Sequence, residues 1–371
     1  MSRLTNIGHA LYEGKVAIDF VSRRRRRLWY AIATIVVTLS VLAFVLRGFT
    51  FGIEFKGGVE FTAQVPKANE ATAAALTEAV EESGVEDIGS PLVNTTGDSA
   101  VRIQTQALSQ ADALKVIDAL EEAGATEVSQ NLIGPSWGAQ VAQKALTGLI
   151  AFLIVVTLFI WAYFREWRMS VAALAALAHD VIATAGVYAL SGFEVTPATI
   201  TAFLTILGYS LYDTVVVFDK VRENTKNITK RSSTTYAEQA NLGVNQTVVR
   251  SINTTLAAML PVAALLIVGV FVLGSGPLKD LALALFVGVI VGAYSSLFLA
   301  PPLAVQLKER EPAIKAHTAR VLANREARTA KAESAVATVS PAPSRPVGAS
   351  GSAKRNQPTR STRSKRNRRS S

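Results

Sequence analysis

The chain has 371 residues and a formal net charge of +10, and 50% of its residues are hydrophobic while 18% are charged. The apolar residues fall in long blocks, which indicates a polytopic membrane protein and excludes an ordinary soluble domain. The sequence contains no cysteine, so disulfides, thiolate metal sites and a cysteine nucleophile are excluded. Its three histidines lie far apart along the chain, so we predict neither a metal site nor any other cofactor.

Six apolar segments are long enough for a helix to cross the roughly 30 Å of a bilayer's hydrocarbon core. The first follows a basic amino-terminal stretch, 1–27, that ends in five consecutive arginines. It is too long for a cleavable signal and lacks a small-residue cleavage pattern, so we interpret it as a retained anchor. The predicted spans cover 28–46, 145–164, 169–190, 198–218, 256–273 and 281–305.

Basic residues predict how these spans are oriented, because loops rich in Lys and Arg stay in the cytoplasm. Two arginines lie in 165–168, six basic residues in 220–250, and sixteen from residue 308 to the end. The alternate loops carry almost none, with no basic residue in SGFEVTP and one in GSGPLK. We therefore expect both termini, and the loop 220–250, in the cytoplasm.

The segment 47–144, between the first two spans, has the composition of a soluble extracytoplasmic domain. Residues 48–143 contain fourteen acidic and four basic side chains, so the positive charge of the chain reflects topology and predicts no nucleic-acid partner. Alternating residues predict strands in FGIEF, VEFTAQV and TEVSQNLIG and a hairpin around 96–98. Helical spacing predicts two helices, the first capped by Asn69. The β-α-β-β-α-β order predicts a small ferredoxin-like α+β domain on an α-helical polytopic membrane protein.

The segment 306–371 is rich in Ala, Ser, Pro, Lys and Arg and poor in bulky apolar residues, so we expect a disordered basic cytoplasmic tail. Its basic clusters, SKRNRR above all, could contact anionic membrane lipid or ribosomal RNA. A solvated tail that obeys the orientation rule is the favoured interpretation.

Two carboxyl groups fall inside predicted spans, Asp180 in AALAHDVIATAG and Asp213 in GYSLYDTVVVFDK. An acid at the bilayer centre costs about 2.5–3.5 kcal/mol on insertion scales, which indicates a role beyond packing. A short outer loop joins the two spans, so we expect neighbouring helices whose acids face one polar interior. Small and hydroxyl residues accompany the acids, and GVIVG at 288–292 predicts a close-packing face. The accompanying residues are Thr184, Gly186, Thr201, Thr205, Gly208 and Ser210.

The alternative is that Asp180 and Asp213 only accept hydrogen bonds that hold helices together. Hydrogen bonds inside membranes average well below 2 kcal/mol, which is less than the insertion cost of a charged acid. Burial disfavours the charged form of a carboxyl group, so such an acid can take up and release protons. One proton that crosses 100 mV releases about 2.3 kcal/mol, enough to bias two near-equal helix packings. We therefore interpret Asp213, and with it Asp180, as proton stops.

Five motifs are distinctive: FGIEFKGG at 51–58, AHDVI at 178–182, GYSLYDTVVVFDKVREN at 208–224, SINTTL at 251–256 and GAYSSLFLAPPL at 292–303. With their order, they resemble the SecD/SecF family of protein-export membrane proteins, within the resistance, nodulation and division superfamily. The resemblance covers roughly residues 15–307, and its motif in the fourth span is the most specific.

The resemblance implies an auxiliary subunit of the Sec protein translocase in the bacterial cytoplasmic membrane. Such a subunit works with SecD, beside the SecYEG channel and often YidC. It uses the proton motive force to assist the export of unfolded polypeptide after the SecA motor has begun it.

The resemblance also implies roles for single residues. The central proton-binding acid would be Asp213, with Asp180 and its neighbour His179 beside the path, and Asp219 and Arg222 would form its cytoplasmic end. Arg250 is a candidate cation for this path, although an interfacial residue of the orientation pattern is the favoured interpretation.

The outer-domain motif contributes Gly52, Glu54, Gly57 and Gly58, and the family commonly has Asp where this chain has Glu54. No Lys-Ser/Thr pair follows the glycines, so we predict a tight backbone passage and no phosphate loop.

Two other functions stay open. One is a half-size exporter of lipid or drug, although about ninety-five outer residues are few for a substrate cleft. The other is a passive scaffold between translocon and insertase. No nucleophile and base occur together, and the context of presenilin-type aspartates is missing, so we predict no enzyme.

Overall fold

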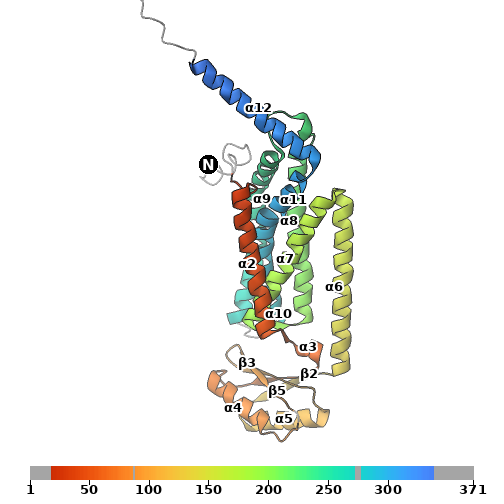
Figure 1. The fold of residues 1–371 in the computed structure, drawn as a ribbon. Coiled ribbons are helices and arrows are strands. Elements are labelled where there is room, and N and C mark those ends of the chain that lie inside the picture. Colours follow the sequence, from red (N-terminus) through yellow and green to blue (C-terminus); the bar gives the residue numbers. More distant parts are fainter. Residues whose placement is uncertain (1–17, 87, 272–276, 338–371) are drawn as a thin grey trace, which may run out of the picture. The chain divides into compact units, whose positions relative to one another are not determined.

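The computed structural model describes residues 18–86, 88–271 and 277–337, and the chain divides into two compact units, Met1–Asn324 and Arg325–Ser371. The first unit contains a helical bundle and a small domain built on a four-stranded sheet (Figure 1). The described part of the second unit, 325–337, is helical.

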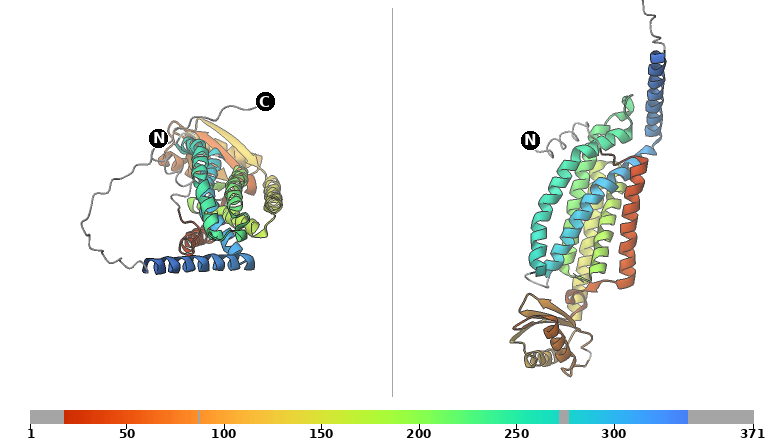
Figure 2. Two further views of the ribbon diagram at one scale, coloured as in Figure 1. Left: turned by 90° about the horizontal axis from the view of Figure 1, so that it is seen from above. Right: turned by 90° about the vertical axis from the view of Figure 1, so that its left-hand side faces the viewer.

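Among the described residues, six helical segments have the length and apolar composition of membrane crossings. This number confirms the prediction of a multi-pass membrane protein. Helices α2 and α9 stand at opposite edges of the bundle (Figure 2). In their most apolar stretches only 17% and 6% of the residues are buried against the rest of the chain. The segments are α2 (Arg23–Arg47), α6 (Pro135–Phe164), α7 (Trp167–Ser191), α8 (Pro197–Thr225), α9 (Tyr236–Phe271) and a sixth that joins α10 (Pro277–Tyr294), the π-helical turn η2 (Ser295–Leu299) and α11 (Ala300–Glu309).

The carboxyl end of α8 and the amino end of α9 extend beyond the predicted spans, so most of the expected loop 220–250 is helical. A short 3₁₀ turn, η1 (Ile228–Lys230), lies between them. The early part of α9 is polar on average but buries a stripe at every fourth position, formed by Tyr236, Ala240, Val244 and Val248. Hydropathy averaged along the chain misses such a helix, because the polar residues on one face offset the apolar residues on the other.

The small domain has a sheet of order β3-β4-β2-β5 in which every neighbouring pair is antiparallel. Its two helices cover the face turned away from the bundle (Figure 1), over a core that contains Phe61, Ile103 and Leu120. The hairpin and the closing strand are confirmed, and Asn69 caps its helix by accepting a 2.8 Å hydrogen bond from the Thr72 N–H. The elements are β2 (Gly58–Gln64), α4 (Glu70–Glu81), β3 (Leu92–Thr96), β4 (Ala100–Thr105), α5 (Gln110–Glu122) and β5 (Glu127–Ile133).

The strand predicted in FGIEF is wrong. Only β1 (Thr50–Phe51) is extended, and α3 (Ile53–Lys56) is a single helical turn. The turn ends at Gly57, whose φ of 77° is a left-handed conformation that favours glycine. β1 pairs in parallel with β6 (Glu194–Val195), which lies between α7 and α8. The start of the small domain is thus hydrogen-bonded to a loop of the bundle.

The other end of the small domain runs straight into the bundle. A single residue, Gly134, separates β5 from α6, and Pro135 occupies the first turn of the helix, where its missing N–H costs nothing. A Cβ atom on Gly138 would lie 2.8 Å from the Phe55 carbonyl oxygen, and one on Gly57 would lie 2.7 Å from the Pro135 Cα. The predicted tight passage at Gly57 is confirmed, and it holds α3 against the first turn of α6.

The expectation of a disordered tail over 306–371 is wrong for its first half. The chain completes α11 and then forms α12 (Pro312–Ala337). Pro312 suits a helix start, and the residues after it include no Gly or Pro and many strong helix formers. Ile314 and Val321 are buried and anchor the first turns of α12. The rest of the expected tail, 338–371, lies outside the described residues.

Helices α8 and α10 approach closely at the predicted GVIVG face, which is therefore confirmed. A Cβ atom on Gly288 would overlap the side chain of Ile206, and one on Gly292 would lie 3.1 Å from the Ser210 Cβ.

We expect Gly288→Ala to lower the free energy of unfolding by about 1–3 kcal/mol, because Ile206 has to move or the helices have to separate. Thermal unfolding of the full chain in detergent measures the change. Gly208→Ala on α8 is the matched control, since its new methyl group would meet no atom within 4 Å. Equal melting temperatures for the two variants would contradict close packing at Gly288.

Candidate functional site

The two predicted acids lie on neighbouring helices, as expected from their short connection, and both meet hydroxyl groups from other helices. Asp180 on α7 is fully buried. Its Oδ2 accepts hydrogen bonds from Ser210 on α8 and from Ser295 on η2, the latter at 2.8 Å. Asp180 therefore joins three membrane segments.

Asp213 on α8 is half-buried and has a parallel arrangement. Its Oδ1 accepts a 2.7 Å hydrogen bond from Ser251 on α9, and its Oδ2 accepts one from Ser296 on η2. Ser295 and Ser296 are consecutive residues, so one turn of the chain contacts both acids. Neighbouring serines of one turn thus bind both carboxylates, and a polar path shared by the two acids stays a prediction.

The π-helical turn η2 follows from the two prolines that come after it. A proline ring clashes with the carbonyl group four residues earlier, and it offers no N–H to that carbonyl. Pro301 and Pro302 would meet the carbonyls of Leu297 and Phe298 in a regular helix, and the wider turn Ser295–Leu299 lies where that conflict arises. Single π turns inside α-helices are rare and often occur at functional sites.

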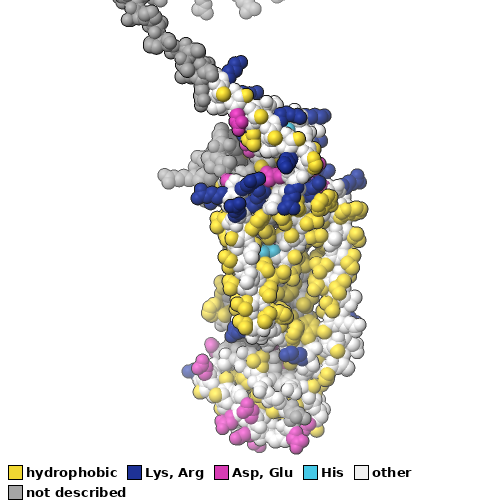
Figure 3. Space-filling view, viewed as in Figure 1, with side chains coloured by type: hydrophobic (Ala, Val, Ile, Leu, Met, Phe, Trp, Pro, Cys, Tyr) yellow, Lys and Arg dark blue, Asp and Glu magenta, His cyan; other side chains and the backbone are white. Residues whose placement is uncertain are grey.

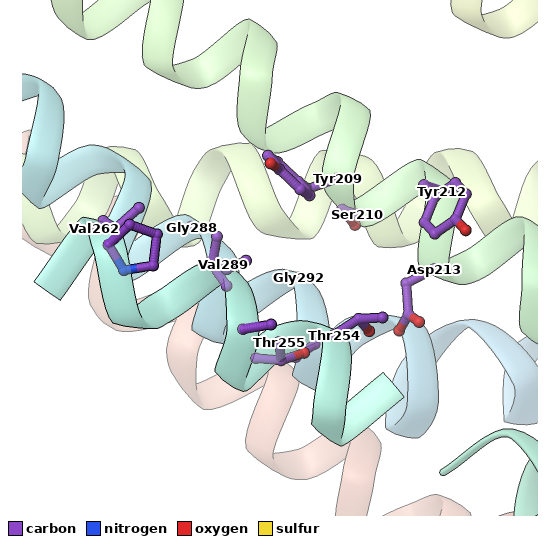
Figure 4. A pocket seen from close by; sticks show the side chains of 14 residues that line it. Tyr209, Ser210, Tyr212, Asp213, Thr254, Thr255, Val262, Gly288, Val289 and Gly292 are labelled. Carbon is purple, nitrogen blue, oxygen red and sulfur yellow. The ribbon is translucent and has the colours of Figure 1, made fainter. Parts of the chain in front are cut away.

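Asp213 also opens into a cavity of about 470 Å³ between α8, α9 and α10. Figure 4 shows its carboxylate pointing from α8 towards α9, the helix that carries Thr254 and Thr255. Most of the wall is apolar, but these hydroxyls, the carboxylate and Tyr212 can hold water, which needs two to four polar partners. Asp213 therefore lines a cavity with room for water, whereas Asp180 is fully buried.

His179 lies next to Asp180 and is buried as well. Its Nδ1 is 3.1 Å from Asp180 Oδ1, and its ring centroid is 5.9 Å from that of Tyr294. Its Nε2 has no hydrogen-bond partner among the described residues. His179 therefore contributes one ring nitrogen to the contacts of Asp180.

The hydroxyl and small residues predicted to accompany the acids divide into two groups. Ser210 contacts Asp180 directly, and Thr184 donates to the Asp180 backbone carbonyl at 2.8 Å. Gly186 serves packing, since a side chain there would overlap Ser40 on α2. Thr201 and Thr205 are exposed and donate to carbonyls of their own helix, and Gly208 is exposed too.

The remaining candidates lie in the second half of α8 and the first half of α9. Asp219 and Arg222 are exposed and line a polar cavity there. Arg250 donates from Nη2 to the Tyr212 hydroxyl at 2.8 Å. In the described part of the chain no cation forms an ion pair with Asp213. Arg250 contacts the neighbouring Tyr212 and does not pair with the Asp213 carboxylate.

Sequence reasoning missed three serines that bind the acids. Ser251 begins SINTTL, and Ser295 and Ser296 stand in GAYSSLFLAPPL, so both motifs were visible. Their residues could not be paired with particular acids, because the π turn changes which side chain faces inward. The double proline that favours this turn was the available signal.

A second polar cluster joins the small domain to the loop between α7 and α8. Arg102 on β4 forms ion pairs with Glu60 on β2 and, at 3.5 Å from Nη2 to Oε2, with Glu194 on β6. Gln104 donates from Nε2 to both carboxylates at 3.1 Å each. Arg102, Gln104 and Glu194 are each only 7% exposed. We call these four residues the outer junction.

Glu54, from the outer-domain motif, lies beside the outer junction. Burial raises the pKa of its carboxyl group, Arg102 opposes that shift, and Glu194 and Glu60 add to it. Its Oε2 is buried without a hydrogen-bond partner among the described residues. Gly52 lets this side chain fold back, because a Cβ atom there would overlap the Glu54 carboxylate. Gly58 lets β2 pass Thr105, whose carbonyl oxygen would lie 2.5 Å from an added Cβ.

The described residues contain no group of three or more histidine or acidic side chains placed to hold a metal ion. The carboxylates of the membrane site have hydroxyl groups as partners, whereas those of the outer junction have a guanidinium group and an amide.

Comparisons with known proteins agree on one family. The model for the carboxy-terminal part of the protein export membrane proteins SecD and SecF matches residues 115–310, and the SecD/SecF GG motif matches residues 42–65. The protein translocase subunit SecF of Streptomyces coelicolor is 47% identical over 338 residues, which cover 90% of this chain and 88% of that protein. The SecF of Mycobacterium tuberculosis is 42% identical, with 85% and 72% covered.

A solved structure gives the same result in three dimensions. The crystal structure of SecDF from Thermus thermophilus, described as a translocon-associated membrane protein, superposes with a TM-score of 0.68 at 31% identity. The match covers 80% of this chain and 39% of SecDF, so the chain spans about two fifths of that structure.

We expect Arg102→Met to lower the free energy of unfolding by about 3–5 kcal/mol, because it leaves two carboxylates of the outer junction without their cation. Thermal or urea unfolding of the full chain in detergent measures this loss. Lys115→Met, which removes the exposed partner of Asp112, is the control and should cost about 1 kcal/mol or less. A loss for Arg102→Met no larger than for the control would contradict the importance of the junction.

Glu54 should make stability depend on pH. Because its pKa is raised in the folded chain, its contribution to stability is present below the unfolded pKa of about 4.3 and is lost as pH rises through the folded value. Glu54→Gln should therefore raise the melting temperature at neutral pH, and the gain should shrink as the pH falls towards 4. A gain that is the same at every pH would show that titration of Glu54 is not its cause.

Proposed function

The chain belongs to the SecD/SecF family of protein-export membrane proteins, and on this premise we propose that it is a subunit of the Sec translocase that uses the proton motive force to assist late steps of protein export. The relatives named above are translocase subunits. The observation that supports proton coupling is the pair of membrane acids held by adjacent serines on one π turn.

In the proposed mechanism, protonation of Asp213 loosens the contacts around η2. A hydrogen bond to a carboxylate is roughly twice as strong as one between neutral groups. A proton on Asp213 therefore weakens its hold on Ser296 and Ser251, and the π turn and α9 can change their packing against α8. Asp180 keeps its contact with Ser295 and serves as the next proton acceptor, with His179 beside it.

The movement reaches the small domain through the hairpin formed by α7, β6 and α8. Both membrane acids lie on these two helices, and Glu194 in the connecting β6 binds Arg102 of the domain. A shift of α7 against α8 therefore acts directly on the outer junction. This arrangement provides a mechanical route from a proton-binding site to the surface that would hold emerging polypeptide.

We assign the domain, residues 47–144, to the ferredoxin-like class and place it outside the cytoplasmic membrane. Figure 3 supports this placement: Lys and Arg gather at one edge of the apolar belt, whereas Asp and Glu dominate the domain at its other end. Both termini, including 1–27, then lie in the cytoplasm, and Asp219 and Arg222 form the cytoplasmic end of the proton path.

SecD is the expected partner, because the SecDF relative is more than twice as long as the part this chain matches. We propose that SecD covers the open side of the cavity beside Asp213, where Tyr209 and Tyr212 are exposed. The complex would act beside SecYEG and YidC on polypeptide that SecA has already engaged.

We expect Asp213→Asn to abolish the stimulation of late export by the proton gradient, because the amide cannot take up a proton. The measurement is completion of a trapped export intermediate in membrane vesicles that contain the full complex, with and without a protonophore. Stimulation should fall to the level that wild type shows with the protonophore.

Glu223→Gln is the matched control, since it removes an exposed acid ten residues further along α8 that has no place in the proposed proton path. This variant should keep most of the stimulation. Gradient-dependent completion by Asp213→Asn at the wild-type rate would reject the proton stop and favour a passive scaffold.

A further inference from the structure

A basic cavity of about 590 Å³ lies between the first turns of α2 and the connection from α11 to α12. Five basic side chains and one carboxylate line it. The basic residues are Arg23, Arg26, Arg27, Arg310 and Lys315, and the acid is Glu309. The excess of positive charge is drawn from two parts of the chain that are almost 300 residues apart in sequence.

Specific contacts build the wall of this cavity. Arg26 is 9% exposed, and its Nη1 donates to Glu309 Oε2 at 3.1 Å. One turn further along α2, the Tyr30 hydroxyl donates to Gln306 at 2.9 Å. The single carboxylate is thus used by one buried arginine. In the described part of the chain, no acid pairs with Arg23, Arg27, Arg310 or Lys315.

A second charged cavity at the same end of the bundle has a different balance. Its lining has four acids and three cations, and Lys308 there contacts Glu166 at 2.6 Å and Glu311 at 2.9 Å. The acids and cations of that cavity nearly balance, whereas the cavity beside α2 keeps an excess of positive charge. The contrast indicates that the cavity beside α2 is suited to an anion supplied from outside the chain.

We propose that this cavity binds the phosphate headgroup of an anionic phospholipid. Figure 3 shows Lys and Arg side chains along one edge of the apolar belt, and the arginines of this cavity stand at the start of the apolar helix α2. Lipid phosphates lie at such an edge of a membrane's apolar layer. Directly below the arginines, α2 exposes Leu28, Ile35 and Leu39, along which an acyl chain can lie. The first turn of α2 contains no acid, so its helix dipole adds to the positive field.

The chemistry selects among lipids. A phosphatidylglycerol headgroup brings one negative charge and no cation, so all five basic groups attract it. Phosphatidylcholine carries a trimethylammonium group that these cations repel. Free phosphate has the charge but lacks the acyl chain that α2 can contact, so it should bind far more weakly.

The test is retention of lipid by the purified full chain, measured by native mass spectrometry from mixed detergent micelles. Wild type should retain phosphatidylglycerol at least tenfold better than phosphatidylcholine, and excess inorganic phosphate should not displace it. We expect Arg23→Gln combined with Arg27→Gln to reduce retention about tenfold, since each cation near a membrane surface adds to the attraction.

The five-arginine run offers a matched control. Arg24→Gln combined with Arg25→Gln removes the same charge from the same turn, but neither residue lines the cavity. This pair should stay within twofold of wild type, and Arg23→Lys combined with Arg27→Lys should also retain lipid, which separates loss of charge from misfolding. Equal losses for the two glutamine pairs, equal retention of phosphatidylcholine, or displacement by inorganic phosphate would each overturn the proposal.

Discussion

A carboxylate inside a membrane bundle needs hydrogen-bond donors, and this requirement organises the structure around Asp180 and Asp213. Their donors come from α8, α9 and η2, so two side chains connect four of the six membrane segments. The close approach of α8 and α10 at Gly288 and Gly292 brings the η2 serines within reach. The same contacts satisfy the acids and hold the helices together, and in the proposed mechanism they are the contacts that a proton weakens.

The carboxylates of the outer junction are also removed from water, but they have different partners. Glu194 is buried and Glu60 half-buried, but a guanidinium group and an amide compensate their charges in place of hydroxyls. Ionic contacts of this kind resist separation and hold the domain on the bundle, whereas serine contacts are weaker and allow rearrangement. The hairpin of α7, β6 and α8 has both kinds of contact. The serine contacts lie along its helices, and the ionic contact of Glu194 lies at its tip.

Sequence alone predicted the features that depend on composition and length. Apolar stretches of sufficient length revealed the six membrane segments. Acids within two consecutive stretches, and the spacing of Gly288 and Gly292, revealed the acid pair and the glycine face. The partners of the acids were not, because helix rotation and the π turn decide which serine faces inward. FGIEF was misread because five alternating residues also suit one helical turn when Gly57 can end it. The helix from Pro312 was missed because propensity and two buried residues were enough to order a segment with little apolar content.

The direct passage from β5 through Gly134 into α6 has a consequence for force transmission. α6 has 30 residues, so it is about 45 Å long, and its outer end is clamped to α3 by contacts at Gly57 and Gly138. A rigid rod joined to a sheet without slack acts as a lever, and a tilt of about 10° about the end far from the sheet would move the other end through roughly 8 Å. Any tilt of α6 is therefore passed undiminished to the attached sheet, which makes this helix the stiffest connection between the bundle and the small domain.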